Sequence, residues 1–170
     1  MTSPPWLRTS EEVASALGSW SGPALALDSE SDSLHHHKEK VCLVQAADGA
    51  GHAWLIDPLQ RPDLSPLGRI VADPAVVKVL HGADYDVVTM KRDFGFTFAG
   101  VFDTMIAARC LGLPAVGLQA LPLTELGAAL TKDSQRADWS VRPPTPRQQA
   151  YALADVQHLL ALYEKLRARL

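Results

Sequence analysis

Two carboxylic acids, Asp28 and Glu30, stand one residue apart directly after an apolar run at residues 24–27. Such a run is typical of a central strand that is buried on both faces. Residues i and i+2 of a strand project from the same face, so both acids point the same way where the strand emerges. Like charges this close repel each other unless a cation lies between them. Asp-x-Glu alone is more typical of a solvated loop, so its meaning depends on acids elsewhere in the chain.

Two later stretches supply such acids. The stretch from His81 to Asp86 follows a β-branched run, so Asp84 or Asp86 lies where a strand ends and a helix begins. Near the end of the chain, Tyr151 and Asp155 are four residues apart and therefore share one face of a helix. Each pattern alone has a plainer interpretation, a helix-capping aspartate in one case and a core tyrosine beside a polar acid in the other.

Taken together, four carboxylates at these positions can converge on one pocket. So many negative charges in a small volume are prohibitive without cations. Ligand sets made only of oxygen select hard ions, which makes Mg²⁺ or Mn²⁺ the expected metal. Two such ions about 3.5–4 Å apart form the site that proteins use for in-line displacement at phosphorus. The acids therefore predict a two-metal site for phosphodiester chemistry.

The first half of the chain is expected to form one helix and an antiparallel meander. Thr9 to Glu12 resembles a capping box for a helix that stops at Gly18. Three short apolar runs with brief connections then predict three successive strands, and Asp48-Gly49 with Gly51 supplies a hairpin turn between the last two. The predicted strands are residues 24–27, 41–44 and 53–56.

The second half alternates helix and strand, which implies parallel strands joined by crossover helices. We expect helices at 64–71, 87–94, 105 onward, 118–130 and 146–169, and strands at 76–80 and 96–102. Asp103 is suited to cap the helix near Met105, and Thr145 with Gln148 opens the last helix. The polar, Pro-rich residues 131–146 predict an irregular segment. The predicted fold is an α/β mixed sheet flanked by helices.

Composition excludes several classes of protein. The chain has 170 residues, enough for one domain, and it has no apolar run near the roughly 20 residues that cross a bilayer. The N-terminus lacks the features of a signal peptide, and Cys42 and Cys110 resemble buried thiols of a reducing compartment, which favours the cytoplasm. A net charge of −3 provides no global basic field for nucleic acid, although local patches or metal ions can supply the attraction.

Three ordered motifs carry a family resemblance: Asp28-Ser29-Glu30, His81-Gly82-Ala83 with Asp86 three residues on, and Tyr151-Ala-Leu-Ala-Asp155. Phe102-Asp103-Thr104 and residues 137–144 are also similar to family segments. Over about residues 22–165 the chain resembles the ribonuclease D branch of the DnaQ-like 3′–5′ exonucleases, the DEDDy type. The resemblance implies a ribonuclease H-like fold, and it selects Asp86 over Asp84 as the metal-binding acid.

The resemblance also implies a reaction, hydrolysis at the 3′ end of a nucleic acid with release of nucleoside monophosphates. Asp28 would bridge two divalent ions, Glu30 and Asp155 would hold the ion beside the nucleophile, and Asp86 would help to place the other ion through water. Tyr151 would orient the attacking water. Asp103 is interpreted as a helix cap or support rather than as a catalytic group.

Members of this branch commonly carry helical nucleic-acid-binding domains after the exonuclease domain. Because this chain stops at Leu170, we expect residues 1–170 to form a single exonuclease domain without one, acting on short single-stranded ends or with a partner that presents the substrate. Candidate phosphate contacts are Lys132, Arg136, Arg142 and Arg147, and a solvated surface run is the alternative interpretation of these four residues. Candidate wedges or stacking residues for terminal bases are Leu34, His81 and Phe102. Residues His35 to His37 are interpreted as a solvated hairpin tip rather than a zinc site.

The leading hypothesis from the sequence is therefore a metal-dependent 3′–5′ exoribonuclease. The same chemistry on DNA is a second hypothesis, because nothing in the sequence visibly reads a 2′-hydroxyl group. A catalytically silent nucleic-acid-binding module is a third, although a mere binder has no need of clustered acids that repel phosphate. A ribonuclease H-type endonuclease would share the sheet, but a Tyr-x-x-x-Asp pattern on the last helix favours the exonuclease.

Overall fold

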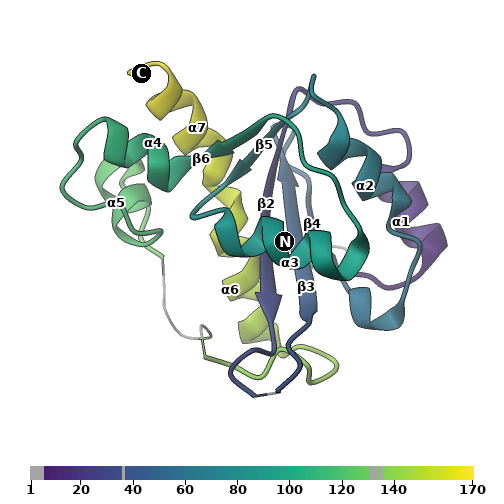
Figure 1. Cartoon of the computed structure of the whole chain (residues 1–170). Coiled ribbons are helices and arrows are strands. Elements are labelled where there is room, and N and C mark those ends of the chain that lie inside the picture. Colours follow the sequence, from purple (N-terminus) through teal and green to yellow (C-terminus); the bar gives the residue numbers. More distant parts are fainter. Residues whose placement is uncertain (1–5, 36, 131–133, 135) are drawn as a thin grey trace.

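The computed structural model describes residues 6–35, 37–130, 134 and 136–170. A six-stranded sheet, with strand order β1-β4-β3-β2-β5-β6, has helices on both faces (Figure 1). The strands are β1 (Trp6–Leu7), β2 (Ala24–Ser31), β3 (Val41–Asp48), β4 (Ala53–Ile56), β5 (Val77–Leu80) and β6 (Val101–Asp103). The helices are α1 (Ser10–Leu17), the 3₁₀ turn η1 (Pro58–Gln60), α2 (Ser65–Ala72), α3 (Asp84–Phe94), α4 (Thr104–Cys110), α5 (Ala120–Leu126), α6 (Pro146–Gln157) and α7 (Leu159–Arg167).

The predicted mixed sheet is confirmed. Strands β2, β3 and β4 pair antiparallel, whereas β5 pairs parallel to β2 and β6 pairs parallel to β5. The sequence did not indicate β1, which pairs parallel to β4 through only two residues, Trp6 and Leu7. Two residues are too few to show the alternation by which a strand is recognised.

Three predicted boundaries were wrong. The strand expected at 96–102 is reduced to β6, because Phe96 turns its ring toward Phe94 and Phe98, with centroid separations of 5.3 and 6.5 Å. The helix expected at 118–130 is α5, which ends where Gly127 adopts a left-handed φ of 71°.

The third correction concerns the last helix, which is two helices. Helix α6 ends at Gln157. The next residue, His158, has φ and ψ of −102° and −9° and interrupts the hydrogen-bonded ladder before α7 begins. The two parts bury largely different surfaces, although Val156 near the end of α6 joins the core of α7. Tyr151 and Ala152 of α6 pack with Leu43 and Leu55 of the sheet, whereas α7 packs with α4 and α5. A break in the helix lets each part follow its own surface.

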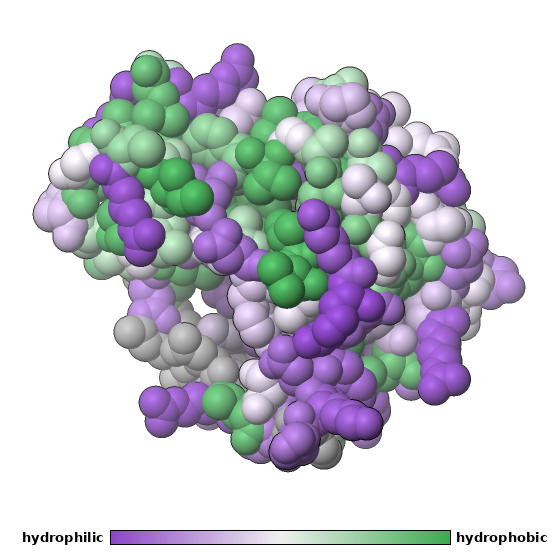
Figure 2. Space-filling model, in the orientation of Figure 1, coloured by the Kyte–Doolittle hydropathy of each residue, from purple (hydrophilic) through white to green (hydrophobic). Residues whose placement is uncertain are grey.

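Each face of the sheet has its own helical layer. Apolar residues of α1, α2 and α3 form a core with Leu25 and Leu27, and those of α4, α5 and α7 form one with Ala26 and Val79 (Figure 1). Leu25, Ala26 and Leu27 are fully buried, which confirms the predicted central strand. An apolar groove of about 600 Å³ lies between α3 and α4, beside the edge strand β6. Figure 2 shows hydrophobic residues gathered around α3 and α4, and hydrophilic residues over the lower part of the same view.

The pairing of β2 prepares the site. Strand β5 pairs only with Ala24–Ala26, whereas β3 pairs with β2 as far as Ser31. The part of β2 that contains Asp28 and Glu30 therefore has a strand neighbour on one side only. Its other side is open to side chains from helices.

Two remaining expectations concern the cysteines and the membrane. Cys42 is buried as expected, but Cys110 is exposed at the end of α4, so the prediction of two buried thiols was wrong for this residue. Within the described residues, no helix combines the length and the apolar character needed to span a membrane.

Candidate active site

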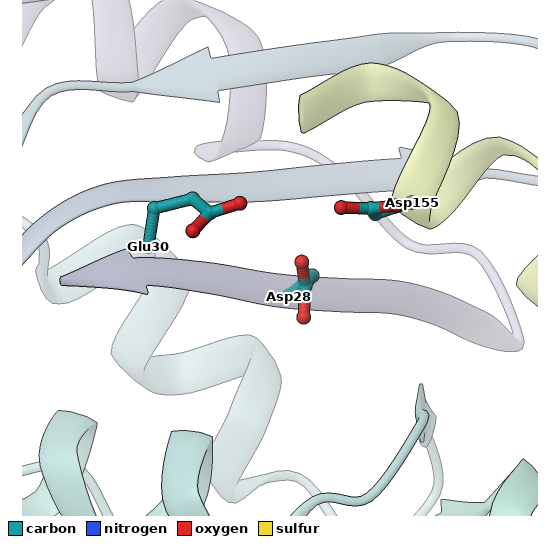
Figure 3. A group of neighbouring side chains, drawn as sticks. All are labelled: Asp28, Glu30 and Asp155. Carbon is teal, nitrogen blue, oxygen red and sulfur yellow. The ribbon is translucent and has the colours of Figure 1, made fainter. Parts of the chain in front are cut away.

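Three carboxylates meet at the open end of β2. Asp28 and Glu30 project from the same face of the strand, and Asp155 approaches from α6 (Figure 3). One carboxylate oxygen from each of the three lies within 4.8 Å of those of the other two. The structure thus brings together three of the four acids that the sequence singled out.

Helix α6 delivers Asp155 and Tyr151 together. It begins at the capping box of Thr145 and Gln148, as predicted, and packs over β2, β3 and β4. Tyr151 is 9% exposed, and its ring lies 6.1 Å from that of Trp139, measured between centroids. Because this contact fixes the ring, the hydroxyl group of Tyr151 is held beside Asp155, one helical turn away.

Asp86 reaches the site from the other side of β2. It lies in the first turn of α3, is 6% exposed, and accepts a 2.5 Å hydrogen bond from Ser29 Oγ. Ser29 alternates with Asp28 and Glu30 along the strand, so it faces the opposite layer. Asp86 is therefore beside the three-acid cluster rather than part of it, while Asp84 is exposed.

Asp103 fixes the turn that leads to Asp86. Its carboxylate accepts hydrogen bonds from the backbone N–H groups of Gly82 at 3.0 Å and Ala83 at 2.7 Å. It also accepts hydrogen bonds from Met105 and Ile106, which caps α4. The interpretation of Asp103 as a cap and support is confirmed, because one carboxylate joins the start of α3 to the start of α4.

Burial raises the pKa of every acid in the site, and repulsion from neighbouring acids adds to this for Asp28 and Glu30. Burial raises the pKa of Glu30 to about 9, with further contributions from Asp155 and Asp86. Burial also raises the pKa of Asp155 to about 7 and that of Asp86 to about 6. The pKa of Asp28 lies well above its ordinary value because of burial first and the three neighbouring acids second.

This set of donors fits divalent metal ions. All of the donors are oxygen atoms, as Mg²⁺ and Mn²⁺ prefer. No lysine or arginine among the described residues forms an ion pair with Asp28, Glu30 or Asp155, so this part of the chain supplies no cation there. Asp155 is buried and the other two acids are half-buried, so without an internal cation the cluster requires one from solution to be ionised.

Burial and the neighbouring acids also raise the pKa of the Tyr151 phenol. The hydroxyl group therefore stays protonated at physiological pH. It is suited to donate a hydrogen bond to a water molecule or a phosphate oxygen, and not to act as a phenolate base.

The predicted substrate contacts are scattered. Leu34 is 68% exposed on the β2–β3 loop, while Arg136 and Arg147 are exposed before and at the start of α6. His81 Nδ1 lies 2.9 Å from Thr104 Oγ1, and the Phe102 ring packs edge-on against Tyr163 at 4.8 Å. These two side chains already have partners within the fold.

Two predicted contacts need separate comment. Lys132 lies outside the described residues. Arg142 forms an ion pair with Asp57, with Nε–Oδ2 and Nη2–Oδ1 distances of 2.8 and 2.9 Å. It also donates to the backbone oxygens of Trp139 and Cys42. This guanidinium group thus joins the segment before α6 to the sheet.

The described residues of the histidine run are exposed to solvent, as expected for a loop tip. His35 and His37 are exposed, and His36 lies outside the described residues. The His35 ring nitrogen lies 3.3 Å from the backbone oxygen of Arg136. No histidine joins a metal-type cluster within the part of the chain that the structure describes.

Sequence reasoning missed two side chains beside the acids, Ser29 and Gln45. Ser29 binds Asp86, and Gln45 lies directly opposite Asp28 on β3. A signal existed for Gln45, because it is the one strongly polar residue within the apolar run from Val41 to Ala47. Ser29 lies inside the first motif, but its partner Asp86 depends on how α3 packs against the sheet, which the sequence does not show.

The comparisons with known proteins agree with this geometry. The family model described as 3′–5′ exonuclease matches residues 5–170, nearly the whole chain. The chain belongs to the 3′–5′ exonuclease family. This result confirms the resemblance drawn from the three motifs.

Individual members of the exonuclease family are similar over almost all of this chain. Ribonuclease D of Pseudomonas paraeruginosa is 40% identical over 167 residues, which cover 97% of this chain and 44% of the relative. The exosome complex exonuclease RRP6 of Saccharomyces cerevisiae is 35% identical over 169 residues, covering 98% of this chain and 23% of the relative. The chain therefore spans less than half the length of these relatives.

A solved member of the family has the same fold. The crystal structure of Escherichia coli RNase D, described as an exoribonuclease involved in structured RNA processing, superposes with a TM-score of 0.90 at 35% identity. The match covers 97% of this chain and 44% of that one. The ribonuclease H-like mixed sheet predicted from the sequence is thus the fold of this exonuclease.

Proposed function

We propose that this protein is a two-metal-dependent 3′–5′ exoribonuclease that releases nucleoside monophosphates from single-stranded RNA ends. The meeting of Asp28, Glu30 and Asp155 within 4.8 Å, with Tyr151 one turn from Asp155, carries the proposal. RNA is favoured over DNA because the similar proteins are named ribonuclease D and an exosome exonuclease. The metal is Mg²⁺ or Mn²⁺, as oxygen ligands prefer.

In this proposal the four acids position the cations. Asp28, Glu30 and Asp155 would hold the cations, Glu30 and Asp155 on the side of the attacking water, and Asp86 would contribute through water. When bound, the cations lower the pKa of water and stabilise the charge on the departing oxygen. Tyr151, with its phenol protonated, orients the water by a hydrogen bond.

The bond changes define the product. The water oxygen forms a bond to phosphorus while the bond from phosphorus to the 3′ oxygen of the preceding nucleotide breaks. That 3′ oxygen takes up a proton, which leaves a shortened strand with a 3′-hydroxyl group and a free nucleoside 5′-monophosphate. Buried acids that place the cations beside one phosphodiester bond suit this in-line displacement.

We also propose where the substrate lies. Arg136 and Arg147 are exposed beside the Tyr151 helix and suit phosphate contacts, and Leu34 suits contact with a terminal base. Arg142 is occupied by Asp57, so we expect it to act on the substrate only by holding this segment. Lys132, His81 and Phe102 stay predictions, as does the cytoplasmic location.

A labelled-substrate assay tests the function. Single-stranded RNA with a 5′ label, incubated with protein and Mn²⁺, should give a ladder that shortens from the 3′ end. Asp28→Asn should abolish the ladder, whereas Asp84→Asn, which removes an exposed acid two residues from Asp86, should retain it. The absence of a ladder from the unaltered protein, or an equal ladder from Asp28→Asn, would refute the proposal.

Matched substrates extend the test to the alternatives. DNA of the same sequence should be shortened more slowly than RNA, and a faster rate on DNA would transfer the proposal to an exodeoxyribonuclease. A circular substrate should stay intact, because an exonuclease needs a free end. Binding of RNA without any cleavage would point to a silent binding module.

A further inference from the structure

Gln45 occupies an unusual place at the centre of the sheet. It lies in the middle of β3, directly opposite Asp28 of β2. Its side chain is fully buried, yet neither the amide nitrogen nor the amide oxygen has a hydrogen-bond partner among the described residues. Buried amides nearly always have partners, so this one is an exception that calls for a physical reason.

The surroundings of Gln45 do not need a polar group. Its neighbours on the same face of β3 are Leu43 and Ala47, and the residue opposite it on β4 is Leu55. Tyr151 and Ala152 of α6 pack on the same layer. A methionine or leucine side chain would fill this volume without desolvating an amide, so packing alone does not explain the glutamine.

Asp28 is the polar neighbour within reach. Residues directly opposite in an antiparallel pair have Cβ atoms about 4.5–5.5 Å apart and side chains on the same face of the sheet. The amide of Gln45 and the carboxylate of Asp28 therefore share one small volume under α6. A hydrogen bond from a neutral donor to a carboxylate is charge-assisted and stronger than a bond between neutral groups.

The other acids of the site show the same arrangement. Asp86 receives a hydrogen bond from Ser29, and Asp155 has the Tyr151 side chain as its partner. Of the two acids on β2, Glu30 lies opposite the apolar Leu43, and only Asp28 lies opposite a side chain that can donate. Gln45 thus completes a series in which neutral donors orient the acids.

We propose that Gln45 is a positioning residue for Asp28. Its Nε2–H group donates to the Asp28 carboxylate through one water and holds it in the orientation that binds the cations. This inference rests on the proposed function, because it concerns the same metal site. Groups of this kind, which bind a metal ligand rather than the metal, typically contribute about 10–100-fold to metal affinity or activity.

Metal binding measured by thermal melting tests the inference without relying on activity. Gln45→Met removes the donor and keeps the volume, and Leu55→Met is the matched control on the other side of Gln45 in the same row. Melting temperatures are measured in chelator and across a Mn²⁺ titration. We expect Gln45→Met to melt in chelator at or above the temperature of the unaltered protein. Its Mn²⁺ midpoint should rise about 10–100-fold, while Leu55→Met leaves that midpoint unchanged.

Steady-state kinetics provide a second readout. At saturating Mn²⁺, Gln45→Met should recover most of its kcat, and its KM for RNA should stay within about twofold, because the lost interaction acts on the metal. A structural role for Gln45 predicts the opposite, a lower melting temperature in chelator with an unchanged Mn²⁺ midpoint, and this would overturn the inference. Gln45→Leu repeats the measurement if the methionine variant does not fold.

The two proposals fail in distinguishable ways. If the unaltered protein shows no stabilisation by Mn²⁺ or Mg²⁺, the proposed two-metal function fails, and the role of Gln45 fails with it. If the unaltered protein is stabilised but Gln45→Met responds identically, only the positioning role is overturned.

Discussion

Two groups of acids lie on or beside this protein's sheet, and their charges are balanced in different ways. Asp57, fully buried after β4, forms an ion pair with Arg142, and Asp32, also fully buried, forms one with Lys40. Asp28, Glu30 and Asp155 come together with no such cation among the described residues. A buried acid with an internal cation serves the fold, whereas acids gathered without one require an ion from outside.

Replacing one acid from each group should give the largest effects, and these should be opposite in sign. Asp57→Asn strands the Arg142 charge and should cost about 3–5 kcal/mol of folding stability, as breaking a buried pair does. Asp28→Asn relieves the repulsion among the clustered acids and should stabilise the metal-free protein. Each 1 kcal/mol gained in folding free energy should raise Tm by about 2–4 °C. Melting in chelator measures both, and a destabilised Asp28→Asn protein would contradict the distinction.

A second comparison separates two tyrosines. Tyr151→Phe removes the hydroxyl group that orients the attacking water and should lower kcat by about 10²–10⁴-fold, the range of a positioned acid–base group. Tyr163→Phe, which removes a buried hydroxyl on α7 bonded to Arg167, is the matched control and should retain full activity. Equal losses in the two variants would remove Tyr151 from the mechanism.

A third comparison tests the neutral donors of the site. Ser29→Ala removes the hydrogen bond to Asp86 and should raise the Mn²⁺ concentration for half-maximal activity by about 10-fold, near the lower limit for such groups. Ser31→Ala lies two residues along the strand, where its hydroxyl group contacts Tyr85 instead of an acid of the site. Its Mn²⁺ dependence should match that of the unaltered protein. The assay is RNA cleavage over a Mn²⁺ series.

The smallest expected effect is a pH dependence of stability. The pKa values of Asp86, Asp155 and Glu30 are raised to about 6, 7 and 9. Between pH 5 and 9 the folded state therefore binds more protons than the unfolded state, so metal-free stability should fall as pH rises. Mn²⁺ should flatten this decline. Melting temperatures measured at intervals from pH 5 to 9, once with chelator and once with Mn²⁺, test this pH dependence. Identical pH profiles with chelator and with Mn²⁺ would contradict the prediction.

Much of the fold was predictable because its signals are local. The capping boxes at Thr9 and Thr145 form as expected, since their partners lie three residues away. The meander followed from short apolar runs with brief connections. The error at 118–130 missed a local signal, because Gly127 ends the helix with a left-handed φ. The errors at 96–102 and at His158 arose where burial against other elements set the boundary, which no short pattern contains.

The sequence by itself determined which groups of the candidate site face the same way. Asp28 and Glu30 share a face because strands alternate, and Tyr151 and Asp155 share one because helices turn every 3.6 residues. The tertiary structure alone decided which acids meet and what balances each one. Arg142 finds Asp57, 85 residues away, Ser29 finds Asp86, and Gln45 lies opposite Asp28. These pairings depend on strand register and helix packing, which are fixed by burying the core rather than by any short stretch of chain.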